Sequence, residues 1–180
     1  MAIKLFSHDP DWIKQAELLI FDLSRLLGDK ASRIDHVGST AVPGLSAKPK
    51  LHIDITLCPD IEPVSLCPPF YLFGYANPGI VRREGEIQLT RPAGRRMFPY
   101  PPSGRPTLMA HRLCLCRSGH TASRHRRNFR DALRSDPVTA ANYQQLKQEL
   151  VARFGPAEDW ERYNSGKTSF ITNVLSQLRT

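Results

Sequence analysis

The segment from residue 51 to residue 57 alternates strictly between apolar and polar side chains. Such alternation is typical of a β-strand that turns one face to the core and the other away from it. Leucine and isoleucine occupy the core positions, whereas His52, Asp54 and Thr56 share the opposite face. The sequence therefore requires a sheet with one apolar face, and it places a histidine and a carboxylate together on the polar one.

A helix and a short strand are expected before this segment. Ser7-His8-Asp9-Pro10 supplies a cap and a proline suited to the first helical turn, and apolar residues then recur at helical spacing until Gly28. A strand is expected over residues 32–37, ending at Gly38-Ser39. Residues 40–47 are expected to form a brief helix or a tight turn, because Pro43 and Gly44 interrupt them.

The rest of the chain divides into a strand-rich part and a helical part. Residues 58–69, rich in proline, are expected to form a loop or a short helix. Turn residues then separate five expected strands, over residues 72–75, 80–83, 86–90, 95–98 and 108–116. Beyond Gly119 the period becomes helical and predicts helices over residues 123–135, 136–154 and 156–178. The prediction is an α+β fold, with a mixed β-sheet flanked by helices and a helical C-terminal third.

The composition bounds the class of protein. The 180 residues, with 41% hydrophobic and 23% charged side chains, suit a single globular domain covering residues 1–180. The longest apolar run, residues 18–21, is far too short to cross a membrane, so a soluble cytoplasmic protein is expected. The four cysteines are then expected to stay reduced, and Cys114 and Cys116 share one face of a strand, as packing residues do.

The formal net charge of +8 is informative about partners. Between Arg82 and Arg134, thirteen arginines face only three acidic residues. This surplus favours a polyanionic partner, although a solvated basic face that keeps the protein soluble explains it equally well. On the helix expected at 123–135, positions 123, 126/127, 130 and 134 form a basic stripe that could grip a nucleic-acid backbone, but it lacks aromatic side chains to stack bases.

Gly38-Ser39 and Asp54 together suggest that the chain handles phosphate. A small residue pair between a strand and a helix lets backbone N–H groups and a hydroxyl approach phosphate oxygens closely. Metal-assisted phosphoryl or nucleotidyl transfer also needs carboxylates that hold Mg²⁺ against those oxygens, and two acids spaced i, i+2 on a strand point the same way. Here His52 stands at the first such position and Asp54 at the second.

The pattern resembles the nucleotidyltransferase superfamily, in which Gly-Ser or Gly-Gly precedes an acid-apolar-acid strand. More closely, residues 36–45, HVGSTAVPGL, followed by Ala47-Lys48-Pro49, resemble the GrpB family (UPF0157). Weaker likenesses follow in the expected order, at Gly94-Arg95-Arg96-Met97-Phe98, Phe129-Arg130-Asp131, Tyr143, Leu146-Lys147, Tyr163, Lys167 and Phe170-Ile171. The resemblance covers most of the chain.

This resemblance implies a nucleotidyltransferase-like fold, a phosphate-binding Gly38-Ser39 and a site for Mg²⁺ or Mn²⁺ at Asp54. It implies a nucleotide or another phosphorylated small molecule as partner but no particular substrate. The family's domain is sometimes joined to dephospho-CoA kinase, a loose link to nucleotide or coenzyme A chemistry. Further phosphate-binding candidates are Lys167 and one of Arg95 and Arg96, which point to opposite faces if they lie on a strand.

Two positions depart from the family's pattern. His52 stands where the family has an aspartate, and residues 111–114 read His-Arg-Leu-Cys where the family tends to show His-His-Leu-His. A neutral imidazole supplies none of the charge with which a carboxylate attracts a divalent ion. Asp54 and His52 are the candidate catalytic and metal-binding residues, and three alternatives remain. The site uses Asp54 with another acid, such as Glu84 or Glu86; it binds a softer ion, such as Mn²⁺ or Zn²⁺, through His52; or the chain binds its ligand without catalysing transfer.

Overall fold

The computed structural model describes residues 2–77, 84–98 and 107–178, and its core is a four-stranded mixed sheet. The strands are β1 (Ala31–Val37), β2 (Leu51–Leu57), β3 (Glu86–Arg91) and β6 (His111–Cys116), in the order β1-β2-β6-β3. Strand β2 pairs antiparallel with β1 and parallel with β6, and β3 closes the sheet antiparallel to β6. The two central strands thus come from distant parts of the chain.

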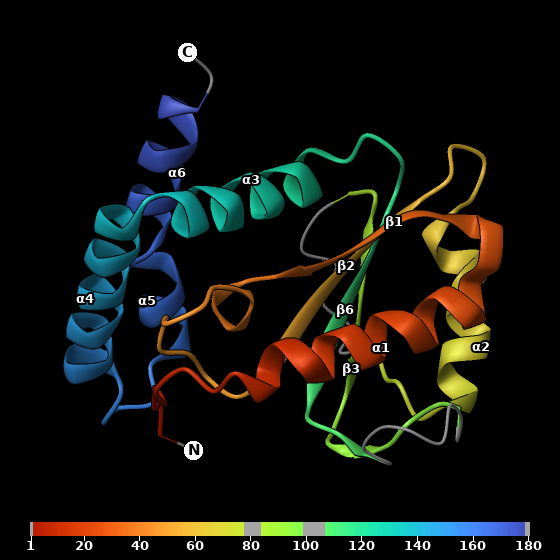
Figure 1. Ribbon diagram of the computed structural model, residues 1–180, viewed down its shortest axis with the longest axis horizontal. Coiled ribbons are helices and arrows are strands. Elements are labelled where there is room, and N and C mark those ends of the chain that lie inside the picture. Colours follow the sequence, from red (N-terminus) through yellow and green to blue (C-terminus); the bar gives the residue numbers. More distant parts are fainter. Residues whose placement is uncertain (1, 78–83, 99–106, 179–180) are drawn as a thin grey trace.

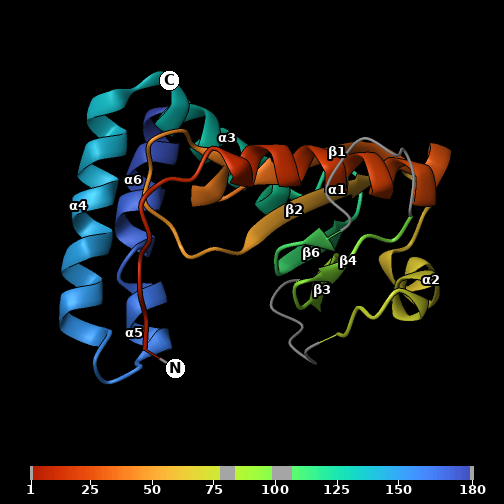
Figure 2. The same cartoon turned by 60° about the horizontal axis from the view of Figure 1, so that its bottom comes forward.

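One face of the sheet carries the main core. Helix α1 (Asp11–Leu27) lies across this face (Figures 1 and 2) and buries its apolar stripe there. The stripe of Trp12, Leu19 and Leu23 meets the apolar side of β2 and β6. The alternation in residues 51–57 is confirmed, because all four of its apolar side chains are fully buried.

Helices cover the other face and one end of the sheet. Helix α3 (Thr121–Ser135) runs over the polar face, whereas α4 (Pro137–Phe154), α5 (Trp160–Ser165) and α6 (Thr168–Gln177) stand together at one end, as Figures 1 and 2 show. A second apolar cluster joins these helices to the loop after β1, through Val42, Leu45, Leu133 and Tyr143. This packing fixes the C-terminal helices beside the Gly38-Ser39 turn.

The remaining elements are short. In the described part of the chain, three 3₁₀ turns connect the larger elements: η1 (Gly28–Lys30), η2 (Ser39–Ala41) and η3 (Pro63–Leu66). Helix α2 (Cys67–Leu72) follows η3 at the far end of the sheet from α4, and β4 (Gly94–Arg95) pairs with β5 (Thr107–Leu108) as a separate two-stranded ribbon.

Several expected elements differ in the structure. The prediction of a strand over residues 72–75 is wrong, because Pro68 and Pro69 lie in the first turn of a helix that ends at Leu72. The strand over 95–98 shrinks to β4, since Arg96 turns inward, and 108–116 divides into β5 and β6. The helix over 156–178 starts only at Trp160, capped by Asp159, and breaks before α6. The strand expected over 80–83 lies outside the described residues.

Candidate functional site

The Gly38-Ser39 turn and strand β2 meet at His52. Gly38 ends β1 with φ at 77°, a conformation that L side chains rarely adopt, and a Cβ atom there would lie 3.2 Å from His52 Nδ1. Glycine is therefore required both by the backbone and by the approach of the imidazole. The turn therefore meets β2 at His52, and Asp54 lies two positions farther along the same strand.

Replacing Gly38 with alanine should lower the free energy of unfolding by about 1–3 kcal/mol. The new side chain would strain the backbone at positive φ and would also press against His52. Gly44 provides a matched control, since its φ is also 77° but a Cβ there would meet nothing within 4 Å. Urea denaturation of G38A and G44A measures both costs. Equal costs in the two variants would contradict a role for the approach of His52.

Cationic side chains gather around this turn. They are Lys48, Lys50, Arg112, Lys147 and Lys167, and we call them the cationic cluster. Lys147 Nζ lies 3.5 Å from Ser39 Oγ and also donates to the Ser46 carbonyl oxygen. Arg112, which pairs with His52 in the β2–β6 register, places Nη2 3.3 Å from His52 Nδ1.

Aromatic rings position the other lysines of the cluster. Lys48 Nζ lies 4.2 Å from the centroid of the Trp160 ring and 5.1 Å from that of Tyr163. Lys167 Nζ lies 4.2 Å from the Tyr163 ring and donates to Asn164 Oδ1. Cation–π contacts attract ammonium groups without neutralising their charge. The two lysines are thus held on one tyrosine while remaining available to an anion.

Burial, followed by mutual repulsion, lowers the pKa values of the four lysines of the cluster. Burial, followed by the charge of Lys167, lowers the pKa of Lys147 to about 7. Burial and the cations nearby also lower the pKa of Lys48 and of Lys167 to about 8 each. His52 feels the same causes, since burial and then Arg112 hold its pKa well below the ordinary value. His52 is therefore neutral at pH 7 and adds no charge of its own.

No carboxylate neutralises the cluster within the described part of the chain. None of its five members joins an ion pair there, and every charged group that shifts the pKa of its lysines is itself a cation. The buried Nε of Arg112 has no hydrogen-bond partner among these residues. Buried charges are normally paired, so the arrangement fits an external anion.

Asp54, by contrast, already has a cationic partner. Arg126 of α3 donates from Nε to Asp54 Oδ2 over 2.6 Å, and its Nη2 lies 2.8 Å from Glu86 Oε2. Burial raises the pKa of Asp54 although the Arg126 charge opposes this. The same carboxylate, working against burial, raises the pKa of Arg126 above its ordinary value. The acid that sequence analysis assigned to a metal is thus held in a buried ion pair.

The residues present do not fit the implied Mg²⁺ or Mn²⁺ ion. A guanidinium lies between the two carboxylates that would hold it, and His52 faces three cations of the cluster, which repel a divalent ion. The third acid on this face, Asp35, is also engaged, 3.4 Å from Arg130 Nη1 and 3.6 Å from Arg127 Nη1. We therefore derive no catalytic step that passes through a metal at Asp54 and His52.

Comparison with protein families identifies this chain. The family model described as GrpB protein matches residues 2–177. The chain belongs to the GrpB family. A UPF0157 protein of Pseudomonas aeruginosa is 31% identical over 179 residues, covering 97% of this chain and 67% of the relative. A UPF0157 protein of Halalkalibacterium halodurans is 25% identical over 181 residues, covering 98% of this chain and 82% of the relative.

The fold of the GrpB family also matches. The crystal structure of conserved protein GrpB from Enterococcus faecalis superposes with a TM-score of 0.76 at 24% identity, covering 97% of this chain and 96% of that one. The expected family and the expected α+β fold are thus confirmed. A dephospho-CoA kinase of Mycolicibacterium paratuberculosis is 28% identical over 167 residues, which cover 84% of this chain but 40% of that enzyme.

The other phosphate-binding candidates of this GrpB protein lie in different places. Lys167 belongs to the cationic cluster. Arg96 is buried and donates from Nη2 to Asp22 Oδ1 over 2.6 Å and from Nε to Asp22 Oδ2 over 3.1 Å, so its charge is used by α1. Arg95 is exposed on β4. Neither arginine is among the residues that contact Ser39 or lower the pKa of His52.

The expected basic stripe on α3 largely faces inward. Arg126 reaches Asp54, Arg130 donates to the His36 carbonyl oxygen over 2.8 Å, and Arg134 donates twice to the Ala41 carbonyl oxygen. Ser123 is buried. These side chains hold the helix on the sheet and on the loop after β1, so they are not available as a continuous surface for a nucleic-acid backbone.

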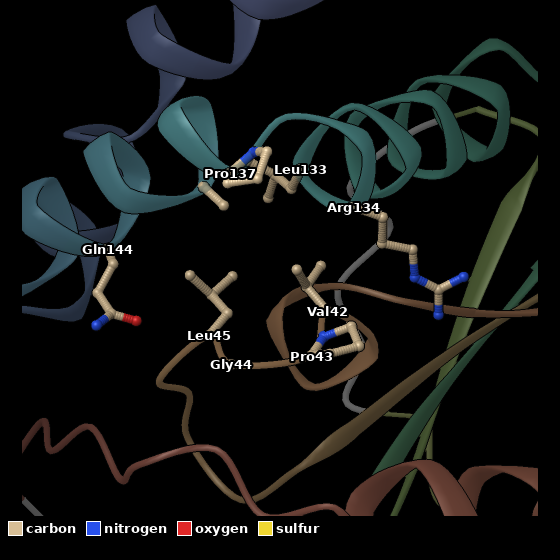
Figure 3. A pocket seen from close by; sticks show the side chains of 9 residues that line it. Val42, Pro43, Gly44, Leu45, Leu133, Arg134, Pro137 and Gln144 are labelled. Atoms are coloured by element: carbon tan, nitrogen blue, oxygen red, sulfur yellow. The ribbon is translucent and has the colours of Figure 1, made fainter.

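A pocket of about 560 Å³ lies on the other side of the loop after β1 (Figure 3). Val42 and Leu45 point across it toward Leu133 and Pro137, whereas the Arg134 side chain turns away to the loop. Its walls are mostly apolar. Its one charged lining residue, Arg134, is bound to the Ala41 carbonyl oxygen, so the cationic cluster is the stronger candidate for a phosphate.

Sequence reasoning missed Lys48, Lys50, Arg112 and Lys147 as site residues. Lys48 and Lys147 lie in the blocks that resemble the GrpB family, which was a usable signal. Arg112 follows from the pairing of β6 with β2, which no local pattern predicts. Within the described ranges, no helix is both long and apolar enough to cross a membrane.

Proposed function

We propose that this GrpB protein binds a phosphorylated small molecule, such as a nucleotide, at the cationic cluster and does not transfer nucleotides. One observation carries the proposal: the five members of the cationic cluster, with Lys147 at Ser39 and Arg112 at His52, have no carboxylate partner among the described residues. A phosphate group supplies the negative charge and the acceptor oxygens that these cationic donors need as partners. Ser39 Oγ, half-buried beside Lys147, would bind the same group.

The electrostatic gain from such a ligand is large. Two unit charges 4 Å apart interact by about 4 kcal/mol at an effective dielectric constant of 20. An anion placed among the lysines replaces repulsion of this order with attraction, and the protein has already lost the solvation of these groups. The neutral His52 supports the same reading, because an aspartate at this position would repel the phosphate unless a metal ion lay between them.

Two alternatives are weaker. Metal-dependent nucleotidyl transfer needs free carboxylates, and Asp54 is engaged by Arg126. Nucleic-acid binding through α3 needs a free basic face, and three of its arginines bind the protein itself. The similarity to a dephospho-CoA kinase supports a nucleotide-like ligand, and it covers less than half of that enzyme. Placement in the nucleotidyltransferase superfamily and a cytoplasmic location remain predictions.

Thermal unfolding with added anions tests the proposal. Pyrophosphate, ATP and coenzyme A should each raise the Tm in EDTA as much as in Mg²⁺, since binding stabilises the folded state by mass action. Adenosine, which lacks phosphate, should leave the Tm unchanged. A Tm shift that requires Mg²⁺ would favour the catalytic alternative, and no shift with any of the three phosphates would refute the proposal.

The pH dependence of binding and of stability should have opposite signs. Lys147 binds a proton with pKa about 7 in the folded protein, below the ordinary 10.5, so the unfolded chain holds more protons between these values. Stability of the ligand-free protein should therefore rise from pH 7 toward pH 10. Affinity for pyrophosphate should fall from pH 7 to pH 9, as the lysines lose their protons. Denaturation and calorimetric titration across this range measure both, and parallel trends would contradict the assignment.

A further inference from the structure

We propose that the guanidinium of Arg126 takes the place of a divalent cation, so that replacing it with an uncharged side chain opens a metal site. The inference concerns the carboxylates Asp54 and Glu86, which we call the acidic pair, and the donors beside them. It goes beyond the proposed function, because Arg126 is not a member of the cationic cluster.

The two carboxylates of the acidic pair contact one shared cation. Asp54 belongs to β2 and Glu86 to β3, with β6 between them, and both carboxylates are 1% exposed. Arg126 reaches over β6 and contacts both, 2.6 Å from Asp54 Oδ2 and 2.8 Å from Glu86 Oε2. Two buried negative charges need a cation between them. Among the described residues, Arg126 is the one cation that an ion pair joins to Asp54, and it also pairs with Glu86 Oε2, whose other oxygen accepts from Gln88 Nε2 over 2.9 Å.

The side chains around Glu86 are those of a metal site. One oxygen of Glu86, the Cys116 sulfur and a ring nitrogen of His120 lie within 4.8 Å of one another. Cys116 Sγ is 3.9 Å from Glu86 Oε2, close to the roughly 3.5 Å expected between two ligands of one tetrahedral Zn²⁺. Arg126 Nη2 lies 3.4 Å from the same sulfur. The guanidinium thus stands next to the sulfur, where an ion would bind.

A polar atom of His120, the third member of this group, also lacks a partner. His120 Nδ1 is buried and has no hydrogen-bond partner within the described ranges. The other ring nitrogen of His120 is bound to the Glu84 carbonyl oxygen over 2.9 Å, the backbone contact that commonly orients a metal-binding histidine. The donor set of carboxylate, thiolate and imidazole suits Zn²⁺ or Co²⁺ better than Mg²⁺.

The use of Arg126 in place of a metal ion also explains how α3 is held on the sheet. Arg126 is covalently part of the helix, so the cation that neutralises the sheet also fixes the helix upon it. A free metal ion would neutralise the acids without this tether. The cation is therefore permanent, and the phosphate site nearby does not depend on metal supply.

The test compares Arg126→Met with Arg126→Lys, using Co²⁺ as the probe. Without the guanidinium, R126M should have a lower Tm in EDTA, recover it with one equivalent of Co²⁺, and show thiolate-to-cobalt absorption that disappears in R126M/C116S. The wild type and R126K, which retain a cation, should show neither effect. R126Q keeps a hydrogen-bond donor for the acidic pair and replaces R126M in the test if R126M does not fold in EDTA. R126Q should gain Co²⁺ binding in the same way.

Two results would overturn the inference. One is Co²⁺ binding by the wild type that is lost in His120→Asn, because the guanidinium would then not exclude the ion. The other is R126M and R126Q that fold but bind Co²⁺ no better than R126K. The pyrophosphate-induced Tm shift, measured on wild type and R126K, separates the two proposals: its absence refutes phosphate binding and leaves the inference about Arg126 standing.

Discussion

Replacing Arg96 with methionine should lower the free energy of unfolding by about 3–5 kcal/mol, the usual cost of removing one partner of a buried ion pair. Asp22 is fully buried in α1, and the two hydrogen bonds from Arg96 supply its charge partner. The affinity for pyrophosphate should not change, because Arg96 lies outside the cationic cluster. Urea denaturation and calorimetric titration measure the two quantities.

Arg95→Met is the matched control for this variant. The neighbouring side chain is exposed, and a surface substitution of this kind usually changes stability by less than about 0.5 kcal/mol. If R96M stayed as stable as R95M but lost pyrophosphate binding, Arg96 would be a phosphate ligand after all, as the sequence suggested.

Replacing Lys147 with methionine should weaken pyrophosphate binding about tenfold to hundredfold, the value of one charge-assisted hydrogen bond. The same change should raise stability at pH 6 by about 1–3 kcal/mol, because it removes an ammonium group that is 2% exposed and has no recorded carboxylate partner in the described chain. The gain should shrink toward pH 10, where the wild-type lysine is neutral in the folded state.

Lys14→Met provides the control, since Lys14 is exposed on the outer side of α1. It should alter neither stability nor binding by more than experimental error. A K147M protein that binds pyrophosphate as tightly as K14M would remove Lys147 from the site. A large loss of stability in K147M at pH 6 would show that the bond to the Ser46 carbonyl outweighs the buried charge.

Local patterns predicted the elements that form the core. The alternation over residues 51–57 and the helical period of residues 11–27 are both strong and both buried, so pattern and packing agree there. Patterns failed where tertiary contacts decide. Tyr75 reads as a strand residue, yet its ring packs on Phe70, and its hydroxyl binds His111 over 2.7 Å after the turn that ends α2.

The site was only partly predictable for the same reason. The sequence assigned Gly38-Ser39 and the polar side of residues 51–57 to one site, and Gly38 does lie against His52. The cationic cluster, however, comes from the loop before β2, from β6, from α4 and from the start of α6. No local pattern joins these segments. The sequence did not predict Arg126 as the partner of Asp54. A helix rich in arginine is typical of a solvated surface, and the face that packs on the sheet is known only from the structure.

The ring contacts of Lys48 and Lys167 with Tyr163 have a consequence for how α6 is attached to the rest of the protein. One ammonium group comes from the loop before β2 and the other from the start of α6, and their like charges repel each other at this junction. An anion bound between them, as proposed, would replace this repulsion with attraction and so strengthen the attachment of α6.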